Sequence, residues 1–185
     1  PDASSPLDGV DLLKAKVSNV GWMGGEYPRS GSGTQLPKGE WNMAHNGDPF
    51  IGSSTYNTMR AWPVSVRRGF LGFEVGNEIL TGAVLTNGSS RANPCRAAYV
   101  DRQGPAKNRQ SWDPATVLLA VRGLGSFWSS EATGMNNVSD MGINGWEDDG
   151  ITHNQSYIVA RAGSPQLVAA AIDELLLRPP SQVEL

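Results

Sequence analysis

Extended and helical patterns of apolar residues alternate along the chain. Residues 17–23 form a short apolar run typical of a strand, and they lead into a glycine-rich loop at residues 24–33. Similar short runs predict further strands at residues 64–67, at residues 70–75 after a glycine, and at residues 157–160.

Two segments have the pattern of helices. Residues 115–122 are apolar and helix-forming, and a stripe of apolar side chains at helical spacing runs over residues 167–176 until Pro179 and Pro180 end it. Four helix starts are predicted where a capping side chain directly precedes a proline. The cap accepts a hydrogen bond from an otherwise unpaired N–H, and proline has no N–H that needs a partner. These pairs begin at Asp48, Asn93, Asp113 and Ser164.

The alternation of strands and helices predicts an α/β fold, with a mixed Rossmann-like sheet flanked by helices. In such sheets, ligands bind at the loops beyond the carboxyl ends of the strands. We therefore expect a site at the loop of residues 24–33.

Composition excludes two classes of partner. The 185 residues suit one domain, and the net charge of −3 with no Lys/Arg cluster gives no footprint for nucleic acid. No apolar run approaches the roughly 20 residues that cross a bilayer. We expect a soluble protein that binds neither nucleic acid nor membrane.

Several residues favour a secreted, extracellular glycoprotein. Cys95 is the only cysteine, so it is either a buried free thiol or bonded to another polypeptide, as an odd cysteine in a secreted protein suggests. N-glycosylation sequons begin at Asn87, Asn137 and Asn154, in Gly/Asn/Ser-rich stretches that predict surface loops.

Few residues suggest chemistry by themselves. Glu40 and Asn42 put a carboxylate and an amide on one side of an extended segment, a spacing that suits two neighbouring sugar hydroxyls. An ordinary polar loop explains the same pair. Asp113 is explained as the N-cap of the next helix. Residues 148–149 could bind a cation, but an acidic surface loop is the simpler interpretation.

Five segments, taken in order, change this interpretation. They are Met23-Gly-Gly-Glu-Tyr-Pro, Gly39-Glu-Trp-Asn, Gly72-Phe-Glu-Val-Gly with Thr81-Gly82, Ser111-Trp-Asp-Pro-Ala-Thr-Val-Leu-Leu-Ala-Val-Arg-Gly, and Gly142-Ile-Asn-Gly-Trp with Gln155-Ser-Tyr-Ile. The ordered set resembles the inosine/uridine-preferring nucleoside hydrolase family, in its plant and fungal branch. It extends over about residues 17–180.

The resemblance implies a glycosidase that cleaves the N-glycosidic bond of ribonucleosides with a calcium ion and a water. The bond breaks through an oxocarbenium-like sugar, so the ribose hydroxyls must be held while charge develops. In this resemblance Glu40 and Asn42 bind the ribose, and Asp113 is a calcium ligand. A carboxylate is a suitable ligand because calcium prefers hard oxygen atoms.

The sequence departs from the family in two places. Trp112 stands where several members have a histidine that assists the leaving base; a tryptophan could instead stack on the base or line the pocket. The family's aspartate-rich N-terminal motif, which supplies the catalytic base and most calcium ligands, has no counterpart here. Residues 1–185 are therefore interpreted as the C-terminal part of a single nucleoside-hydrolase-like domain, incomplete without an N-terminal segment and with no catalytic base in this chain.

Three hypotheses follow. In the first, an N-terminal polypeptide of the same precursor completes a secreted ribonucleoside N-glycosidase. Whether a disulfide through Cys95 links the two polypeptides, and whether the complete unit forms a homo-oligomer, are left open. In the second, the chain is a non-catalytic secreted glycoprotein that acts by binding, for example at a cell surface. In the third, it is a truncated piece without natural activity. The isolated chain is expected to be inactive in each.

Overall fold

The computed structural model describes residues 4–28, 39–40 and 49–178. Its helices are α1 (Gly9–Lys16), α2 (Pro49–Ala61), α3 (Phe73–Gly76), α4 (Ala83–Gly88), α5 (Pro94–Gln103), α6 (Trp112–Arg122) and α7 (Ser164–Leu177). Its strands are β1 (Asn19–Met23), β2 (Gly39–Glu40), β3 (Arg67–Leu71), β4 (Leu80–Thr81), β5 (Arg109–Gln110), β6 (Trp128–Glu131), β7 (Met135–Val138), β8 (Ile143–Glu147) and β9 (Gln155–Ala160). Asn42, Asp48 and Pro179 lie outside the described residues.

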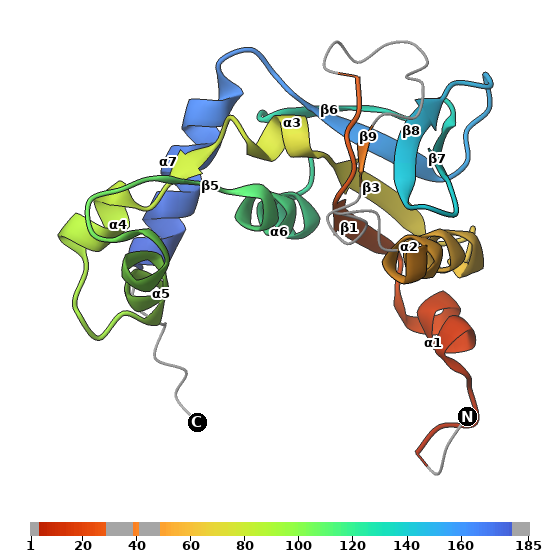
Figure 1. The fold of residues 1–185 in the computed structure, drawn as a ribbon, viewed down its shortest axis with the longest axis horizontal. Helices are drawn as coiled ribbons and strands as arrows, with labels where there is room; N and C mark the ends of the chain where they lie inside the picture. The colour runs from red at the N-terminus through yellow and green to blue at the C-terminus, as the bar shows by residue number, and fades with distance from the viewer. Residues whose placement is uncertain (1–3, 29–38, 41–48, 179–185) are drawn as a thin grey trace.

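The central sheet has four strands in the order β1-β3-β9-β6 (Figure 1). β1, β3 and β9 are parallel, with Val20 opposite Arg68 and Arg68 opposite Gln155, whereas β6 is antiparallel to β9. A second, antiparallel sheet has the order β2-β8-β7, and β4 pairs with β5. The α/β class is therefore confirmed.

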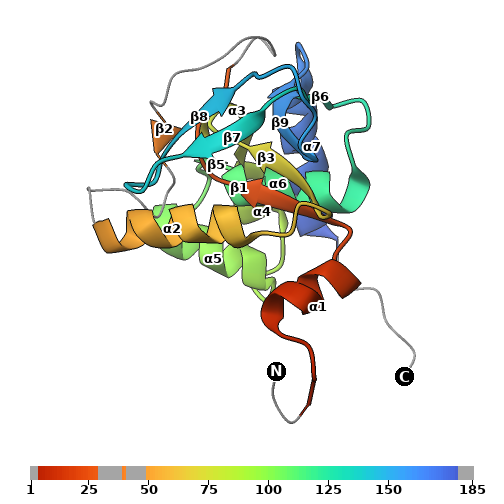
Figure 2. The same ribbon diagram turned by 90° about the vertical axis from the view of Figure 1, so that its right-hand side faces the viewer.

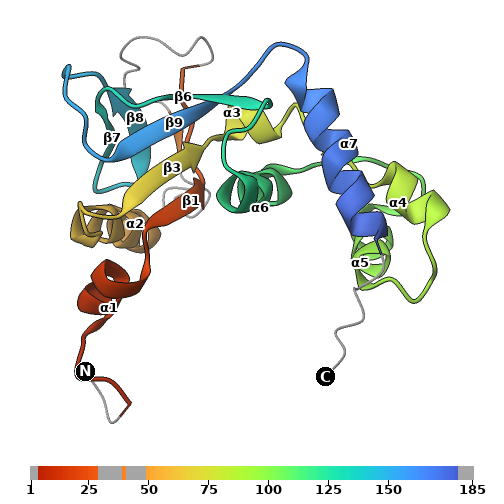
Figure 3. The ribbon, with the colours of Figure 1, turned by 180° about the vertical axis from the view of Figure 1, so that it is seen from behind.

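Successive side chains of a strand point to opposite faces, so the sheet has two cores. Phe70 of β3 packs with Tyr157, Trp146 and Val138 on the face covered by β7 and β8. Leu71 packs on the other face with side chains of α6 and α7. Figures 2 and 3 show α2 near β7 and β8, and Figure 3 shows α4, α5 and α7 grouped at the opposite end.

Three of the predicted elements are found with shifted ends. The expected strand at residues 17–23 is β1, that at residues 157–160 lies within β9, and the expected helix at residues 115–122 is α6, which begins three residues earlier. The prediction for residues 64–75 is partly wrong. One strand, β3, runs through the glycine at position 69, and the residues after Gly72 form α3.

The proline pairs predict helix starts only to within two residues. At α5 the prediction is confirmed: the Asn93 side chain accepts hydrogen bonds from the N–H groups of Cys95 (2.8 Å) and Arg96 (3.1 Å). Asp113 is not an N-cap, because Ser111 holds that position and Asp113 lies in the first turn of α6. Ser164 is already helical, with Gly163 before it at φ 72°.

A chain of buried polar contacts fixes the start of α6 against α7. Asp173 of α7 accepts a hydrogen bond from the N–H of Gly82 at 3.0 Å. The neighbouring Thr81 hydroxyl lies 2.5 Å from the Ser111 hydroxyl and 2.8 Å from that of Tyr99. Because Thr81 and Ser111 are fully buried, these contacts replace water and hold α6 in one position.

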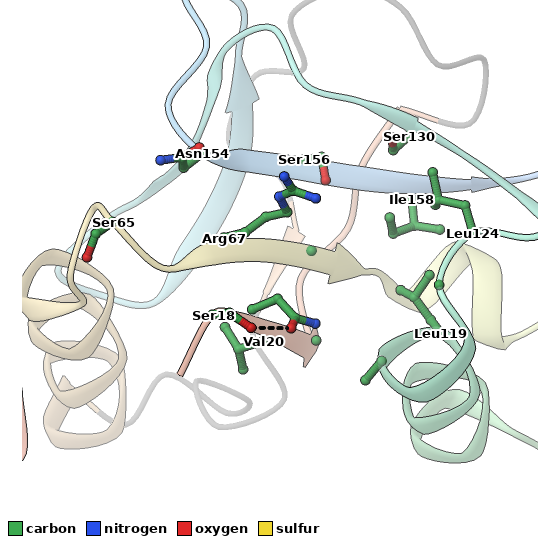
Figure 4. A pocket seen from close by; sticks show the side chains of 15 residues that line it. Ser18, Val20, Ser65, Arg67, Leu119, Leu124, Ser130, Asn154, Ser156 and Ile158 are labelled. Carbon is green, nitrogen blue, oxygen red and sulfur yellow. Dashed lines mark hydrogen bonds between the residues drawn. The ribbon is translucent and has the colours of Figure 1, made fainter. Parts of the chain in front are cut away.

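One part of the sheet has no cover among the described residues. A hollow of about 510 Å³ lies on the α6 side of β1, β3 and β9. In Figure 4, Arg67 extends across it toward Ser156. Gly21, Gly69 and Ser156 place little bulk on this face. At its rim β1 is an edge strand, paired only with β3 in the part of the chain that the structure describes. No described helix is long and apolar enough to cross a membrane.

Asp173 tests the link between α7 and α6. Burial raises the pKa of its carboxyl, and the Gly82 N–H partly lowers it. A folded-state pKa above the unfolded one means that the charge destabilises the fold above that pKa and that the penalty vanishes below the unfolded pKa. Asp173→Asn keeps an acceptor for Gly82, so we expect equal or greater stability at pH 7. Its difference from the native chain should shrink as the pH falls toward about 4.

Asp173→Ala is the matched comparison, because it leaves the Gly82 N–H buried without an acceptor. It should lower the free energy of unfolding by about 1–3 kcal/mol in urea denaturation. An Asn variant as unstable as the Ala variant would show that the carboxylate charge, and not the hydrogen bond, matters here.

Candidate functional site

The carboxyl ends of β1 and β3 meet at one edge of the sheet. The Gly24 N–H donates to the Leu71 carbonyl at 3.3 Å, and the Phe73 N–H donates to the Gly25 carbonyl at 2.8 Å. Gly25 has φ 78°, and a Cβ on it would lie 2.8 Å from the Asn144 amide, so only glycine suits this position. Two parallel strands thus end in backbone loops that are hydrogen-bonded to each other, which is where α/β sheets bind ligands.

Asn144 of β8 joins the second sheet to this edge. It is fully buried; its Oδ1 accepts from the Glu26 N–H at 3.0 Å, and its Nδ2 donates to the Glu26 carbonyl at 3.2 Å. In the ladder, Asn144 is opposite Gly39 and Ile143 is opposite Glu40. The backbone of Glu40 therefore lies close to the loop that follows β1. The Glu40 side chain and all of Asn42 are outside what the structure describes.

A buried carboxylate that sequence reasoning missed organises the same edge. Glu74 is 3% exposed, and its Oε2 accepts a hydrogen bond from the Tyr27 N–H at 3.2 Å. The pKa of the Tyr27 hydroxyl is well above its usual value, first because it is buried and second because Glu74 is nearby. Glu74 lies between Gly72 and Gly76, and a Cβ on Gly72 would meet its carboxylate. These two glycines are the sequence signal that could have indicated a buried side chain.

Trp112 is held rigidly at the start of α6. Its indole N–H donates to the Phe73 carbonyl at 3.0 Å, and its ring stacks on that of Phe73 with centroids 5.5 Å apart. Gly76 is packed against it, and the Arg109 guanidinium lies 6.0 Å from its ring centroid. Because the indole N–H is already engaged, Trp112 offers a ring surface to a ligand and not a hydrogen-bond donor.

Asp113 is exposed, next to Trp112, and its side chain has no hydrogen-bond partner among the described residues. It begins an exposed stripe on α6 that continues one and two turns later with Val117 and Val121, which are 61% and 78% exposed. Asp113 and these valines line an apolar groove of about 470 Å³ between α6 and α7. Its carboxylate is therefore available to a ligand from outside the described chain.

The described residues do not make a calcium site by themselves. Calcium takes about 6–8 oxygen ligands. No group of three or more His, Cys, Asp or Glu that could hold a metal is found in residues 4–28, 39–40 and 49–178. Asp149 is engaged with His153 at 2.7 Å, and this contact is the main reason that the Asp149 pKa is low. The residues at the start of α6 thus supply one carboxylate, and further oxygens would have to come from elsewhere.

The sequons and the cysteine are accessible to different degrees. Asn87, Asn137 and Asn154 are all exposed, but only Asn154 lies in a turn, with φ 55°. The prediction of surface loops is wrong for Asn87, which lies in the last turn of α4, and for Asn137, which is in β7. Cys95 is a half-buried free thiol in the first turn of α5.

Comparison with solved structures identifies the fold. The chain is similar to a plant nucleoside hydrolase, the PpNRh1 enzyme, with a TM-score of 0.54 and 20% sequence identity. The match covers 91% of this chain and 56% of that one, so this chain spans little more than half the length of the plant enzyme. No protein-family profile matches the sequence, and no curated protein matches it. The chain therefore has an α/β fold that corresponds to part of a nucleoside hydrolase fold.

Proposed function

We propose that this chain is the C-terminal part of a secreted ribonucleoside N-glycosidase, whose site forms at the carboxyl ends of β1 and β3. The observation that carries the proposal is the position of Trp112 and of the Asp113 carboxylate, which is unpaired among the described residues. Both lie at this edge of a sheet that matches part of a nucleoside hydrolase fold. The ordered motifs from Met23 to Gln155 support the same assignment.

Each residue of the site has a chemical role in this proposal. Glu40 and Asn42 hold the ribose hydroxyls, because a carboxylate accepts hydrogen bonds and an amide both donates and accepts. Trp112 and Phe73 present stacked rings on which a flat base can lie. Asp113 gives one oxygen to a calcium ion, which when bound would lower the pKa of a water molecule.

A second polypeptide, from the N-terminal part of the same precursor, completes the site in this proposal. The uncovered face of the parallel sheet supports it, because such sheets are normally covered on both faces. The β1 edge supports it too: its sequence, Asn-Val-Gly-Trp-Met, has none of the charged or proline residues that usually protect an edge strand. A half-buried Cys95 would allow, but does not require, a disulfide to that polypeptide.

The apolar groove between α6 and α7 supports the same partner. Val117, Val121, Ile172 and Leu175 line it, and its surface is almost entirely apolar. Exposed apolar grooves of this kind are typical of interfaces. Because Asp113 is at one end of the groove, any segment that covers the groove also reaches Asp113. The missing calcium ligands would then come from the segment that completes the core.

Val117→Asp tests the groove in the complete protein. The substitution should weaken binding of the completing polypeptide by at least about tenfold, because it buries an unpaired charge at the contact. The isolated variant should stay within about 0.5 kcal/mol of the native chain, since Val117 is exposed there. Val84→Asp is the control, because Val84 is 55% exposed on α4 and outside the groove. Equal binding by both variants would exclude the groove as the interface.

Glu40→Ala and Asn42→Ala should each raise KM and lower kcat for a ribonucleoside in the complete protein, because they remove ribose contacts that strengthen in the transition state. Steady-state hydrolysis of inosine and uridine measures both constants. Unchanged kinetics for either variant would reject its ribose role, and turnover by the isolated chain would contradict the need for an external base.

Asp113→Asn should weaken calcium binding in the complete protein by at least about tenfold, because it removes a charged oxygen ligand. The stability of the fold should change little, since the Asp113 side chain makes no hydrogen bond among the described residues. Asp101→Asn, which changes an exposed acid on α5, is the control. Calcium titration calorimetry that gives the same affinity for both variants would remove Asp113 from the metal site.

A further inference from the structure

A second pocket lies at the opposite end of the sheet, where β3 and β9 begin. It is a cavity of about 310 Å³ between α2, the first residues of β3 and β9, and β7. Arg68, Trp62, Asn136 and His153 are among the residues that line it. None of the residues of the candidate site contributes to it, so the two sites are separate.

Arg68 is buried in this pocket without a counter-ion in the part of the chain that the structure describes. It is 5% exposed and lies on the same face of β3 as the core residue Phe70. Its Nε has no hydrogen-bond partner, and its guanidinium makes no ion pair with the residues that the structure describes. Burial lowers the pKa of Arg68, and no carboxylate offsets this effect. A buried charge is normally paired, so the Arg68 Nε lacks an acceptor among the described residues.

Two more donors in the pocket lack acceptors among residues 4–28, 39–40 and 49–178. The Trp62 Nε1 and the Asn136 Nδ2 are both buried without a partner. The orientation of the Asn136 amide is set by its Oδ1, which accepts from the Asn144 Nδ2 at 3.1 Å. The unsatisfied groups of Arg68, Trp62 and Asn136 are therefore all N–H donors, which indicates a ligand that supplies only acceptors.

The described ionisable side chains that line the pocket give it a net positive charge. Arg60 lies over the ring of Tyr56, with its Cζ 5.2 Å from the centroid. None of the described residues that line the cavity carries a carboxylate. His153 is paired with Asp149, whose oxygen is 2.7 Å from the His153 Nε2. Glu147, the other acid bonded to a residue of the pocket, accepts a hydrogen bond from the Asn137 amide at 3.1 Å. Both acids are thus engaged, and Arg68 and Arg60 have no acidic partner among the described residues.

We propose that this pocket is a binding site for a small organic anion, whose carboxylate or phosphate oxygens accept hydrogen bonds from Arg68, Asn136 and Trp62. A guanidinium binds such oxygens in a bidentate manner, and burial strengthens each of these charge-assisted bonds. The cavity is larger than a bare phosphate, so the anionic group belongs to a larger molecule whose apolar part contacts the Met59 and Val138 side chains.

Titration calorimetry with inorganic phosphate and with acetate tests this site in the purified protein. Arg68→Met should weaken binding of the preferred probe by about tenfold or more, because it removes the charged donor. Arg67→Met is the matched control, since Arg67 is the neighbouring residue on the other face of β3; it should change the affinity by less than about twofold. Comparing the affinities for phosphate and for acetate shows whether the site prefers a phosphate or a carboxylate group.

Asn136→Asp is the second variant. It keeps the oxygen that accepts from Asn144 but places a carboxylate beside Arg68, so it should abolish binding while the chain stays folded by circular dichroism. Binding of neither probe at about 10 mM, or equal affinities for the Arg68 and Arg67 variants, would overturn the proposal. Binding that disappears when a completing polypeptide is present would overturn it too, because that polypeptide's own acceptor would then be the ligand of Arg68.

Discussion

A parallel sheet is stable in water only when both faces are covered and its edges are paired or protected, because its strands carry apolar side chains on both sides. The four-stranded sheet meets this condition on the face of Phe70, and beside Leu71 where α6 and α7 pack. It does not meet it along β1 or over the hollow crossed by Arg67, within the described residues. In the proposed function, one completing segment would account for both the incomplete cover and the incomplete site.

The position of α6 connects folding to the proposed chemistry. Buried contacts through Asp173, Gly82, Thr81 and Ser111 fix its first turn, and the stacking of Trp112 on Phe73 fixes its rotation about that point. Asp113 is thereby held at the end of an apolar groove without a partner of its own among the described residues. Several buried hydrogen bonds thus position a carboxylate that has no partner among the described residues. This arrangement is consistent with a ligand that binds Asp113 from outside the described chain.

The sequence predicts elements whose apolar pattern is long or regular. Prediction fails for strands whose polar residues resemble a loop although some of their side chains are buried. The stripe of α7 and the run of β1 were readable, whereas β7 and β8 were not, because Met-Asn-Asn-Val and Ile-Asn-Gly-Trp-Glu resemble loops until Trp146 is seen buried. The neighbouring Arg67 and Arg68 look alike in sequence, yet strand alternation exposes one and buries the other. The burial of Glu74 was also missed, because a carboxylate between two glycines gives no apolar periodicity that would mark a buried position.

In the proposed function, a segment outside this chain pairs with β1. The Ser18 carbonyl accepts from the Arg67 N–H, and the Gly24 N–H donates to the Leu71 carbonyl, so the even-numbered residues of β1 face β3. The N–H groups of the alternate residues Asn19 and Gly21 therefore point toward the free edge. Amide hydrogen exchange at these two residues, compared between the isolated chain and the protein as purified from its source, measures that pairing directly. We expect fast exchange in the isolated chain and exchange slowed by at least about tenfold in the native protein. Equal rates in the two samples would contradict it.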